Sequence, residues 1–279
     1  MLKTDLKKAI INMIPGPLKK MYHFFFDARA QLAWTGNYAD WSSALKKSLG
    51  YDNAIILEKV KTSVLKVKNG EAAYERDSVV FDKIEYEPQL VKTINQCAKE
   101  NNGILDVIDF GGSLGSSYFQ YKTVLTDAKE IHWNVVEQAH FVYCGKKFIG
   151  DNSLKFFDTI EEAMGDREAH VLYLASVIQY FEEPYDLIEK CLRYNFEYII
   201  IDRTAFIDDS KDRITVQKVP ESIYKASYPA WFFSEQKFIG AFTGKYQLLE
   251  TFVSEVSKPM QLKDNKRVYW KGFILKKKQ

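Results

Sequence analysis

The residues with the clearest chemical potential stand together in the segment Asp-Phe-Gly-Gly-Ser-Leu-Gly at positions 109–115. The apolar run Ile104–Phe110 is typical of a strand buried on both faces, and ligands of open α/β sheets bind at the carboxyl ends of such strands. Glycines there allow a close backbone approach to a ligand. A plain strand-to-helix turn would contain the same glycines. The candidate cofactor-binding residues of this turn are Asp109, Gly111, Gly112, Ser113 and Gly115.

A second acidic residue, Glu137, follows the next predicted strand, Ile131–Val136. A carboxylate at this place can accept hydrogen bonds from both ribose hydroxyls of an adenosine ligand, and NAD enzymes use the same device. A dinucleotide fingerprint starting at Gly111 requires glycine near positions 113 and 116, where this chain has Ser113 and Ser116. The turn fits instead the methyltransferase pattern acid-x-Gly-x-small-x-Gly. We therefore expect the cofactor to be S-adenosyl-L-methionine, with Glu137 among its ligands.

Two further predicted strands end in polar residues at the same edge of the sheet. Asp158 follows Leu154–Phe157, where it can accept a hydrogen bond from an adenine amino group or cap the helix that begins at Thr159. Ser176 and Tyr180 follow the fourth strand, at the place where methyl group and acceptor meet in methyltransferases of this fold. We predict that Asp158 and Ser176 bind the cofactor and that Tyr180 is a catalytic candidate.

The stretch after the fifth predicted strand, Tyr198–Ile201, is expected to project over the carboxyl edge of the sheet. Arg203 suits a phosphate or carboxylate group because of its planar fork of donors. Asp202 is a candidate general base toward a hydroxyl. Tyr228 and Trp231 can stack on a sugar ring. The alternative is a structural lid, in which Asp202 and Arg203 form an ion pair and the aromatic side chains form the core.

The elements that must position these residues alternate along the chain from residue 104 onward. Alternating strands and helices predict a parallel sheet covered on both faces. Tyr246–Glu255 and Val268–Lys276 then follow one another as strands without a convincing helix between them, so they pair as an antiparallel hairpin. An antiparallel last strand distinguishes class I methyltransferases from dinucleotide dehydrogenases. The predicted fold is therefore α/β, a Rossmann-like class I methyltransferase sheet with an N-terminal helical extension.

The predicted domains are a mainly helical N-terminal extension, residues 1–102, and a cofactor-binding domain, residues 103–279, with an acceptor-side insertion at residues 203–245. Within the extension we expect helices at about Trp41–Ser48 and Pro88–Lys99, and strand or loop structure around Ile55–Lys68.

The first 30 residues differ from the rest of the chain. Residues 1–29 contain six Lys or Arg and two Asp, a net charge of +4, in a helical pattern of apolar residues that ends at Pro15-Gly16-Pro17. A basic amphipathic helix of this kind either makes peripheral contact with an anionic membrane surface or packs on the body of the protein with its lysines in solvent.

Composition excludes several classes of function. The net charge of +2 and the lack of a basic stripe argue against a nucleic-acid partner. Cys97, Cys144 and Cys191 are widely spaced without a histidine cluster, so we expect buried free thiols and no metal site. No apolar run reaches the ~20 residues that cross a bilayer, and no signal peptide is recognisable, so we expect a cytoplasmic protein. Nothing in the pattern specifies an oligomeric state.

The sequence resembles an uncharacterised bacterial family of putative class I methyltransferases that depend on S-adenosyl-L-methionine. The resemblance covers most of the chain. It is carried by residues 110–118, Trp133 with Val136-Glu137-Gln138, Asp202-Arg203-Thr204, residues 214–217, residues 227–231, Trp41, Ala44 and Gly50-Tyr51-Asp52. Members are associated with surface-polysaccharide gene clusters, which implies a small-molecule or glycan-linked acceptor.

The sequence therefore predicts a methyltransferase that O-methylates a sugar or glycan-linked acceptor in surface polysaccharide biosynthesis. Asp202, Arg203 and Tyr180 are its catalytic candidates. Two alternatives stay open at this stage. One is an NAD-dependent sugar-modifying enzyme, and the other is a non-catalytic binding protein on a methyltransferase scaffold.

Overall fold

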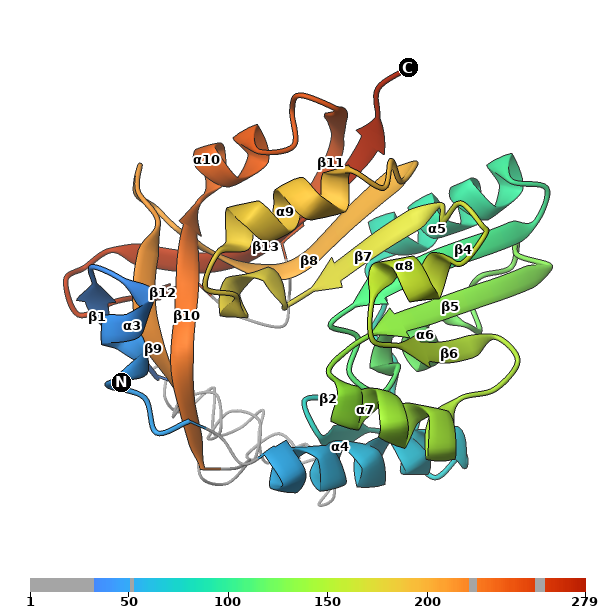
Figure 1. The fold of residues 1–279 in the computed structure, drawn as a ribbon, viewed down its shortest axis with the longest axis horizontal. Coiled ribbons are helices and arrows are strands. Elements are labelled where there is room, and N and C mark those ends of the chain that lie inside the picture. Colours follow the sequence, from blue (N-terminus) through green and yellow to red (C-terminus); the bar gives the residue numbers. More distant parts are fainter. Residues whose placement is uncertain (1–32, 51–52, 221–224, 254–258) are drawn as a thin grey trace, which may run out of the picture.

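A mixed β-sheet organises the computed structural model, which describes residues 33–50, 53–220, 225–253 and 259–279 (Figure 1). The elements in chain order are β1 (Ala33–Tyr38), α3 (Trp41–Leu45), α4 (Asn53–Lys68), β2 (Tyr74–Arg76), β3 (Val79–Phe81), α5 (Pro88–Glu100), β4 (Ile104–Phe110), α6 (Ser116–Tyr121), β5 (Glu130–Val136), α7 (Ala139–Cys144), η1 (Gly145–Ile149), β6 (Leu154–Phe157), α8 (Ile160–Met164), β7 (Val171–Ala175), η2 (Ile178–Tyr180), α9 (Pro184–Leu192), β8 (Tyr198–Ile207), β9 (Arg213–Val219), β10 (Ala226–Ser234), α10 (Glu235–Gly240), β11 (Tyr246–Val253), β12 (Met260–Gln261) and β13 (Arg267–Lys277).

The strands of the main sheet lie in the order β6-β5-β4-β7-β8-β13-β11. The five strands from β6 to β8 are parallel, because helical crossovers join them. β13 is antiparallel to β8 and to β11. The chain runs from β4 outward to β6 and then crosses back to β7 on the other side of β4, so β4 and β7 flank the topological switch point. This is the Rossmann-like class I methyltransferase fold.

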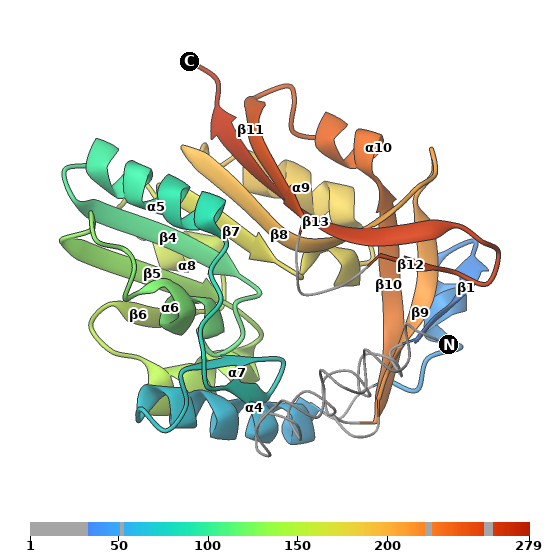
Figure 2. The same cartoon turned by 180° about the vertical axis from the view of Figure 1, so that it is seen from behind.

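Helices cover both faces of this sheet and define two apolar cores. On one face, Val60 of α4, Leu90 of α5 and Phe141 of α7 pack with buried strand residues, and we call this the α5-side core. On the other face, α8, α9 and α10 pack on the sheet and form the α9-side core. Figure 2 shows α5 and α6 in front of the strands when the molecule is seen from behind. Strand residues alternate between the cores, so Val107 faces the first and Ile108 the second.

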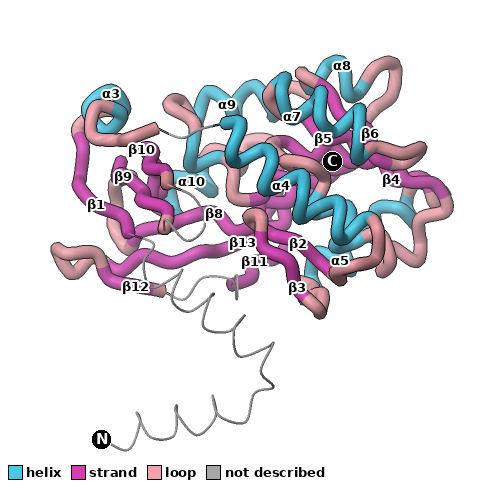
Figure 3. The backbone as a smooth tube through the Cα atoms, turned by 90° about the horizontal axis from the view of Figure 1, so that it is seen from below, coloured by secondary structure: helices cyan, strands magenta, loops and turns pink. Residues whose placement is uncertain are grey.

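A smaller antiparallel group, β1-β9-β10, continues from β8. β10 joins β8 only at its end, where Phe233 and Ser234 lie opposite Phe206 and Ile207. Figure 3 shows these strands at one end of the molecule and the parallel strands β4, β5 and β6 at the other. Residues 33–38 are thus tied to the part of the chain that follows the fifth parallel strand.

The terminal hairpin is confirmed, since β11 and β13 pair antiparallel over most of their length. Asp40 caps α3, since its side chain accepts from the backbone N–H of Ser43 at 2.7 Å. The prediction of strand or loop structure around Ile55–Lys68 is wrong, because this segment is helix α4. Its β-branched residues favour a strand, but Val60 and Val64 are buried in the α5-side core, and this packing outweighs propensity.

The N-terminal region also contains three strands, β1, β2 and β3, which the expectation of a mainly helical segment did not include. The predicted helices of residues 1–30 lie outside the described residues. None of the helices within the described ranges is long and apolar enough to cross a membrane. Cys97, Cys144 and Cys191 are buried free thiols, as expected.

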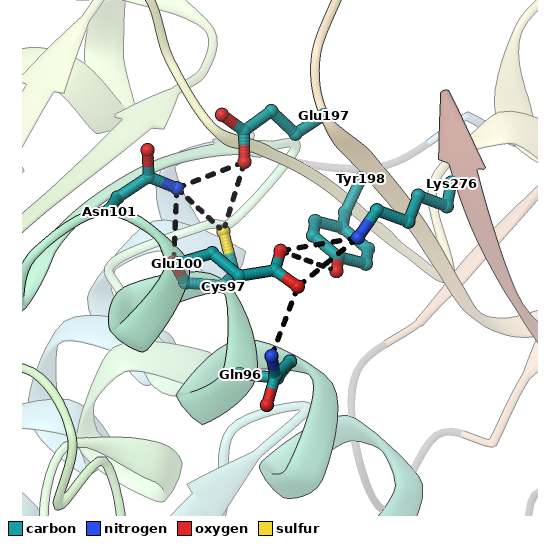
Figure 4. A network of polar contacts seen from close by, with 7 residues as sticks. All are labelled: Gln96, Cys97, Glu100, Asn101, Glu197, Tyr198 and Lys276. Carbon is teal, nitrogen blue, oxygen red and sulfur yellow. Dashed lines mark hydrogen bonds and ion pairs between the residues drawn. The ribbon is translucent and has the colours of Figure 1, made fainter. Parts of the chain in front are cut away.

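A polar network ties the amino end of the sheet together (Figure 4). Glu100, at the end of α5, accepts from the Tyr198 hydroxyl at 2.9 Å and pairs with Lys276 at 3.2 Å. The Asn101 amide donates to Glu197 at 2.9 Å. The network joins α5 to the start of β8 and the end of β13, at the end of the sheet opposite to the predicted site.

Candidate functional site

The carboxyl ends of the parallel strands form one continuous edge. Phe110 of β4 lies opposite Val136 of β5, and Val136 lies opposite Phe157 of β6. The residues that follow these three are Gly111, Glu137 and Asp158. Since neighbouring strands lie ~4.8 Å apart, the backbones of Gly111 and Asp158 are separated by about 10 Å along the edge. The sheet therefore brings together three of the predicted cofactor residues.

On the other side of β4 the edge continues through β7 and β8. Ala175 lies opposite Asp202, and the backbone N–H of Ser176 donates to the Asp202 carbonyl at 2.9 Å. The Ser176 hydroxyl accepts from the Gln179 side chain at 3.0 Å, which holds the turn into η2. Ser176 thus lies between the glycine turn and the pair Asp202–Arg203, because β7 lies between β4 and β8.

The glycines of the turn are required by the protein itself. Gly111 has a φ of +73°, and a Cβ on it would lie 2.3 Å from Val177. A Cβ on Gly112 would lie 2.4 Å from the Asp109 carboxyl carbon. Gly115 has a φ of +84° and faces Leu154 in the same way. Packing explains all three, so these glycines shape the turn but do not by themselves demonstrate a ligand.

Glu137 is tied to the glycine turn. Its carboxylate accepts from its neighbour Gln138 N–H at 2.7 Å and from the Ser113 N–H. Burial raises the pKa of Glu137, and these two N–H donors oppose the rise. The arrangement fixes the carboxylate beside the turn, where an adenosine ribose is expected.

Asp158 does not cap the helix that follows it. The N-cap of α8 is Thr159, whose hydroxyl accepts from the Glu162 N–H at 3.1 Å. Asp158 is exposed at the sheet edge. Of the two roles open from the sequence, the cap therefore belongs to Thr159, and the Asp158 side chain is left facing solvent at the edge.

A β-bulge in β8 sets the direction of Arg203. Lys271 of β13 lies opposite Thr204 and Phe273 lies opposite Ile201, so Asp202 and Arg203 together face the single residue Gly272. Arg203 has a left-handed φ of +50°. Because of the extra residue, Asp202 and Arg203 point to the same side and form an ion pair of 2.6 Å. In a regular strand, neighbouring side chains would point to opposite faces.

The bulge also changes which face of the sheet the alternate side chains of β8 point to. Before it, Ile200 faces the α5-side core, whereas after it Phe206 faces the α9-side core. An inserted residue has this effect because the side-chain period of a strand is two. The prediction that strand five ends at Ile201 is wrong, since β8 continues through the bulge to Ile207.

Strained backbone gathers at this edge. Ser113, Ser176 and Arg203 have φ values of +54°, +53° and +50°. Left-handed conformations of such residues cost about 1–3 kcal/mol each and persist where the surroundings enforce them, often at functional sites. Three different loops or strands contribute one such residue each to the same edge.

Beneath the edge lies a buried layer of polar and aromatic side chains. Asp109 is fully buried, and its carboxylate accepts from the Trp133 indole N–H at 2.8 Å. The Tyr173 hydroxyl donates to Asp202 at 3.0 Å. One carboxylate oxygen of Asp109 and one of Asp202 lack a hydrogen-bond partner within the described residues. Burial raises the pKa of Asp109 to about 7, against the opposing effects of Trp133 and Arg203.

A cavity of about 250 Å³ opens above this layer, on the side of the sheet that carries the α5-side core. Its walls are the glycine turn, the first turn of α6, helix α4 and the hairpin residues 74–78. The predicted site residues that line it are Asp109, Gly111, Gly112, Ser113, Ser176, Tyr180 and Arg203. Those that do not line it are Gly115, Glu137, Asp158 and Asp202.

The three aromatic candidates have different positions. Tyr180 and Tyr228 line the cavity with their rings edge to face at 5.3 Å. The Tyr180 hydroxyl donates to Gln217 at 3.0 Å, and burial raises its pKa to about 12, so at neutral pH it is a hydrogen-bond donor. Trp231 lies away from the cavity, where it stacks on Trp41 and donates to the backbone of residue 181. It has the structural role that the lid interpretation gave it.

The sequence interpretation missed the wall formed by α4 and the β2–β3 hairpin. Glu75 of β2 is 2% exposed and lines the cavity. The hairpin turns at Asp77 and Ser78, both with positive φ. A two-residue turn between Tyr74–Arg76 and Val79–Phe81 is the signal that marks a hairpin of this kind, although Asp-Ser is weaker than Asp-Gly.

Comparisons with known proteins agree with this description without adding to it. No protein-family model matches the chain, and no curated protein matches it. Among solved structures, it is similar to the N-terminal domain of EvdMO1 with S-adenosylhomocysteine bound (9% identity, TM-score 0.47, 82% of this chain and 98% of that chain). It is also similar to the 1,6-didemethyltoxoflavin N1-methyltransferase of Burkholderia thailandensis (9%, 0.43, 90% and 97%). A third is CalS10, an amino pentose methyltransferase from Micromonospora echinaspora (8%, 0.40, 68% and 89%). The strand order, rather than these distant similarities, establishes the fold class.

Proposed function

We propose that this protein is a methyltransferase that uses S-adenosyl-L-methionine. The observation that supports the proposal most is the row of Asp158, Glu137, Gly111 and Ser176 along one edge of a sheet whose last strand is antiparallel. A dinucleotide-binding sheet has six parallel strands in the order 3-2-1-4-5-6. The antiparallel β13 next to β8 therefore favours the methyl donor over NAD.

The residues present fit such a cofactor. Glu137 and Asp158 supply carboxylates for the ribose and adenine at one end of the edge. The cavity at the other end is lined by the buried Asp109, whose second carboxylate oxygen has no partner in the described part of the chain. When bound, the cofactor supplies a sulfonium methyl group that an acceptor atom can attack directly.

The chain's own contribution is then mainly to position the acceptor and exclude water. Arg203 lines the cavity and can orient an anionic or hydroxyl group there, while Asp202, buried beneath it, holds its guanidinium. We assign Asp202 a positioning role for this reason, instead of the general-base role considered from the sequence. Tyr180 donates a hydrogen bond at the outer end of the cavity.

We further propose that the acceptor is a hydroxyl of a sugar or glycan-linked molecule. Tyr180 and Tyr228 present aromatic rings at the cavity, and a sugar ring packs well on such surfaces. Arg203 in the same wall suits a phosphate or carboxylate on the sugar. A role in surface polysaccharide biosynthesis is supported by the family resemblance alone.

Binding of S-adenosylhomocysteine tests the proposal. We expect micromolar affinity for the wild-type protein by isothermal titration calorimetry, and a loss of about tenfold or more in Glu137→Ala, because two ribose hydroxyls lose their acceptor. Gly111→Arg is a poor test, since its side chain would collide with Val177 and disturb the turn.

Glu168→Ala, in the exposed loop before β7 at the amino end of the sheet, is the matched control and should bind like the wild type. Equal affinity of the wild type and Glu137→Ala would remove the site assignment. No binding by the wild type would contradict the proposed function.

A further inference from the structure

Glu75 is a buried carboxylate in the wall of the cavity. It belongs to β2, is 2% exposed, and faces the first turn of α6 just after the glycine turn. One of its carboxylate oxygens accepts from the Ser116 hydroxyl, and the other accepts from the backbone N–H of Ser78 at 2.8 Å. The hydroxyl and the amide fix the carboxylate in place, but neither carries a charge.

Within the described residues, no cation forms an ion pair with Glu75. Arg76, its neighbour in the hairpin, places its guanidinium over the rings of Tyr74 and Phe81, 5.9 and 5.3 Å from their centres. Across the cavity, Arg203 is paired with Asp202 at 2.6 Å. Burial raises the pKa of Glu75 to about 7, and among the smaller influences Asp77 and Arg76 act in opposite directions.

Buried carboxylates in proteins are ordinarily paired with a cation, because desolvation of an isolated charge is costly. No described residue forms an ion pair with Glu75, so the ammonium or other cationic group of a ligand in the cavity would fulfil that expectation. Asp109 lines the same cavity, and no ion pair to its carboxylate forms within the described residues, so two buried carboxyls lie in the lining of one cavity.

The position of the cavity along the sheet edge indicates which part of the ligand enters it. Glu137 and Asp158, the carboxylates assigned to the adenosine, do not line the cavity. A volume of about 250 Å³ is also smaller than the pockets of ~300–1,000 Å³ that enclose whole cofactors. The part that enters the cavity is therefore the amino-acid end, which carries an ammonium group with three N–H donors.

We propose that Glu75 binds the α-ammonium group at the methionine end of the cofactor, an inference that depends on the proposed function. The hairpin β2–β3 would then be part of the cofactor site, and Ser116 would orient the carboxylate toward the ligand.

Calorimetry with two ligands tests this assignment. S-adenosylhomocysteine carries the ammonium group, whereas 5′-methylthioadenosine has the same adenosine without the amino-acid end. In Glu75→Gln we expect affinity for S-adenosylhomocysteine to fall at least about tenfold, and affinity for methylthioadenosine to change less than about threefold. Glutamine has the shape of glutamate and can keep the contacts with Ser78 and Ser116. Asp82→Asn removes an exposed charge just after the same hairpin and should leave both affinities unchanged.

The pH dependence of the wild type provides a second measurement that needs no variant. The titratable groups that line the cavity with Glu75 are Tyr74, Arg76 and Asp77 on the hairpin and Asp109, Tyr180, Arg203 and Tyr228 on the other elements. Affinity for S-adenosylhomocysteine should rise between pH 6 and pH 8, as Glu75 ionises, while affinity for methylthioadenosine stays level. Glu75→Gln should remove most of the rise.

Three results would overturn the assignment. The first is an unchanged affinity of Glu75→Gln for S-adenosylhomocysteine, and the second is an equal loss of affinity for both ligands. The third is a pH dependence of binding that persists in Glu75→Gln and so belongs to Asp109. Failure of the wild type to bind either ligand is a different result, since it contradicts the proposed function itself.

Discussion

Asp109 shows how a residue's neighbours decide its chemistry. In the sequence it is an acid at the end of a strand. In the folded protein it is fully buried against Trp133, and its pKa is raised to about 7. Glu75 has the same ionisation range for the same reason. Two carboxyls that titrate near neutrality in one cavity are a property of the fold, because burial and not residue type raises their pKa.

The buried Asp109 predicts a pH-dependent stability. Its folded pKa of about 7 exceeds the ordinary aspartate value of 3.8, so between these pH values the folded protein binds more protons than the unfolded chain. Its contribution to the free energy of unfolding therefore falls as pH rises from about 4 to 7. An asparagine at this position cannot ionise, so the Asp109→Asn variant does not have this loss. Its free energy of unfolding, relative to that of the wild type, should therefore rise by about 2 kcal/mol between pH 5 and pH 8. Urea unfolding of the ligand-free proteins at both pH values measures the difference, and an identical difference at the two values would contradict the burial argument.

At the scale of elements, β8 and β13 decide where Arg203 points. The bulge at Asp202 and Arg203 is accommodated opposite Gly272, the one residue of β13 that lies opposite both of them. Gly272 also lies opposite Phe252 of β11, and a Cβ on Gly272 would lie 2.0 Å from the Phe252 ring. The direction of Arg203 thus depends on a glycine in another strand.

Gly272→Ala should therefore destabilise the protein by about 1–3 kcal/mol, the usual cost of an overpacked core. Gly240→Ala is the matched control. Gly240 ends α10 and has no atom within 4 Å of an added Cβ, so alanine there should be neutral or slightly stabilising. Chemical denaturation of both variants measures the two effects. A neutral Gly272→Ala would mean that Phe252 can move aside at little cost.

At the scale of the whole molecule, the cavity is assembled from distant parts of the chain. Helix α4 and the β2–β3 hairpin come from the N-terminal region, and the glycine turn comes from the middle of the chain. Arg203 comes from the fifth parallel strand, β8, and Tyr228 from β10. The pairing of β1 with β9, and of Gly50 with Ser227, joins the first and last of these regions. The division into residues 1–102 and 103–279 stays a prediction, but the proposed site draws on both parts.

A ligand that binds such an assembled site stabilises the whole fold. S-adenosylhomocysteine at a hundred times its Kd should add about 2.7 kcal/mol, which corresponds to a rise in Tm of roughly 5–10 °C for a chain of this size. NAD at the same concentration should leave Tm unchanged. A thermal-shift measurement with both ligands distinguishes them, and stabilisation by NAD alone would favour the dehydrogenase alternative.

The sequence by itself determined the parallel strands, the terminal hairpin and the glycine turn. These features depend on patterns within short segments, such as the apolar run Ile104–Phe110 before Asp109. Once the strands are parallel, their carboxyl ends must meet at one edge, so the positions of Glu137 and Ser176 followed as well.

Only the tertiary structure decided the features that depend on contacts between distant segments. The β-branched residues of α4 favour a strand, yet the segment is a helix because Val60 and Val64 are buried in the α5-side core. The bulge at Arg203 exists in the register between β8 and β13, which no single strand contains. Glu75 is an ordinary glutamate in the sequence. It becomes a candidate cofactor ligand because the fold buries it beside the glycine turn, with no ion pair to any residue that the structure describes.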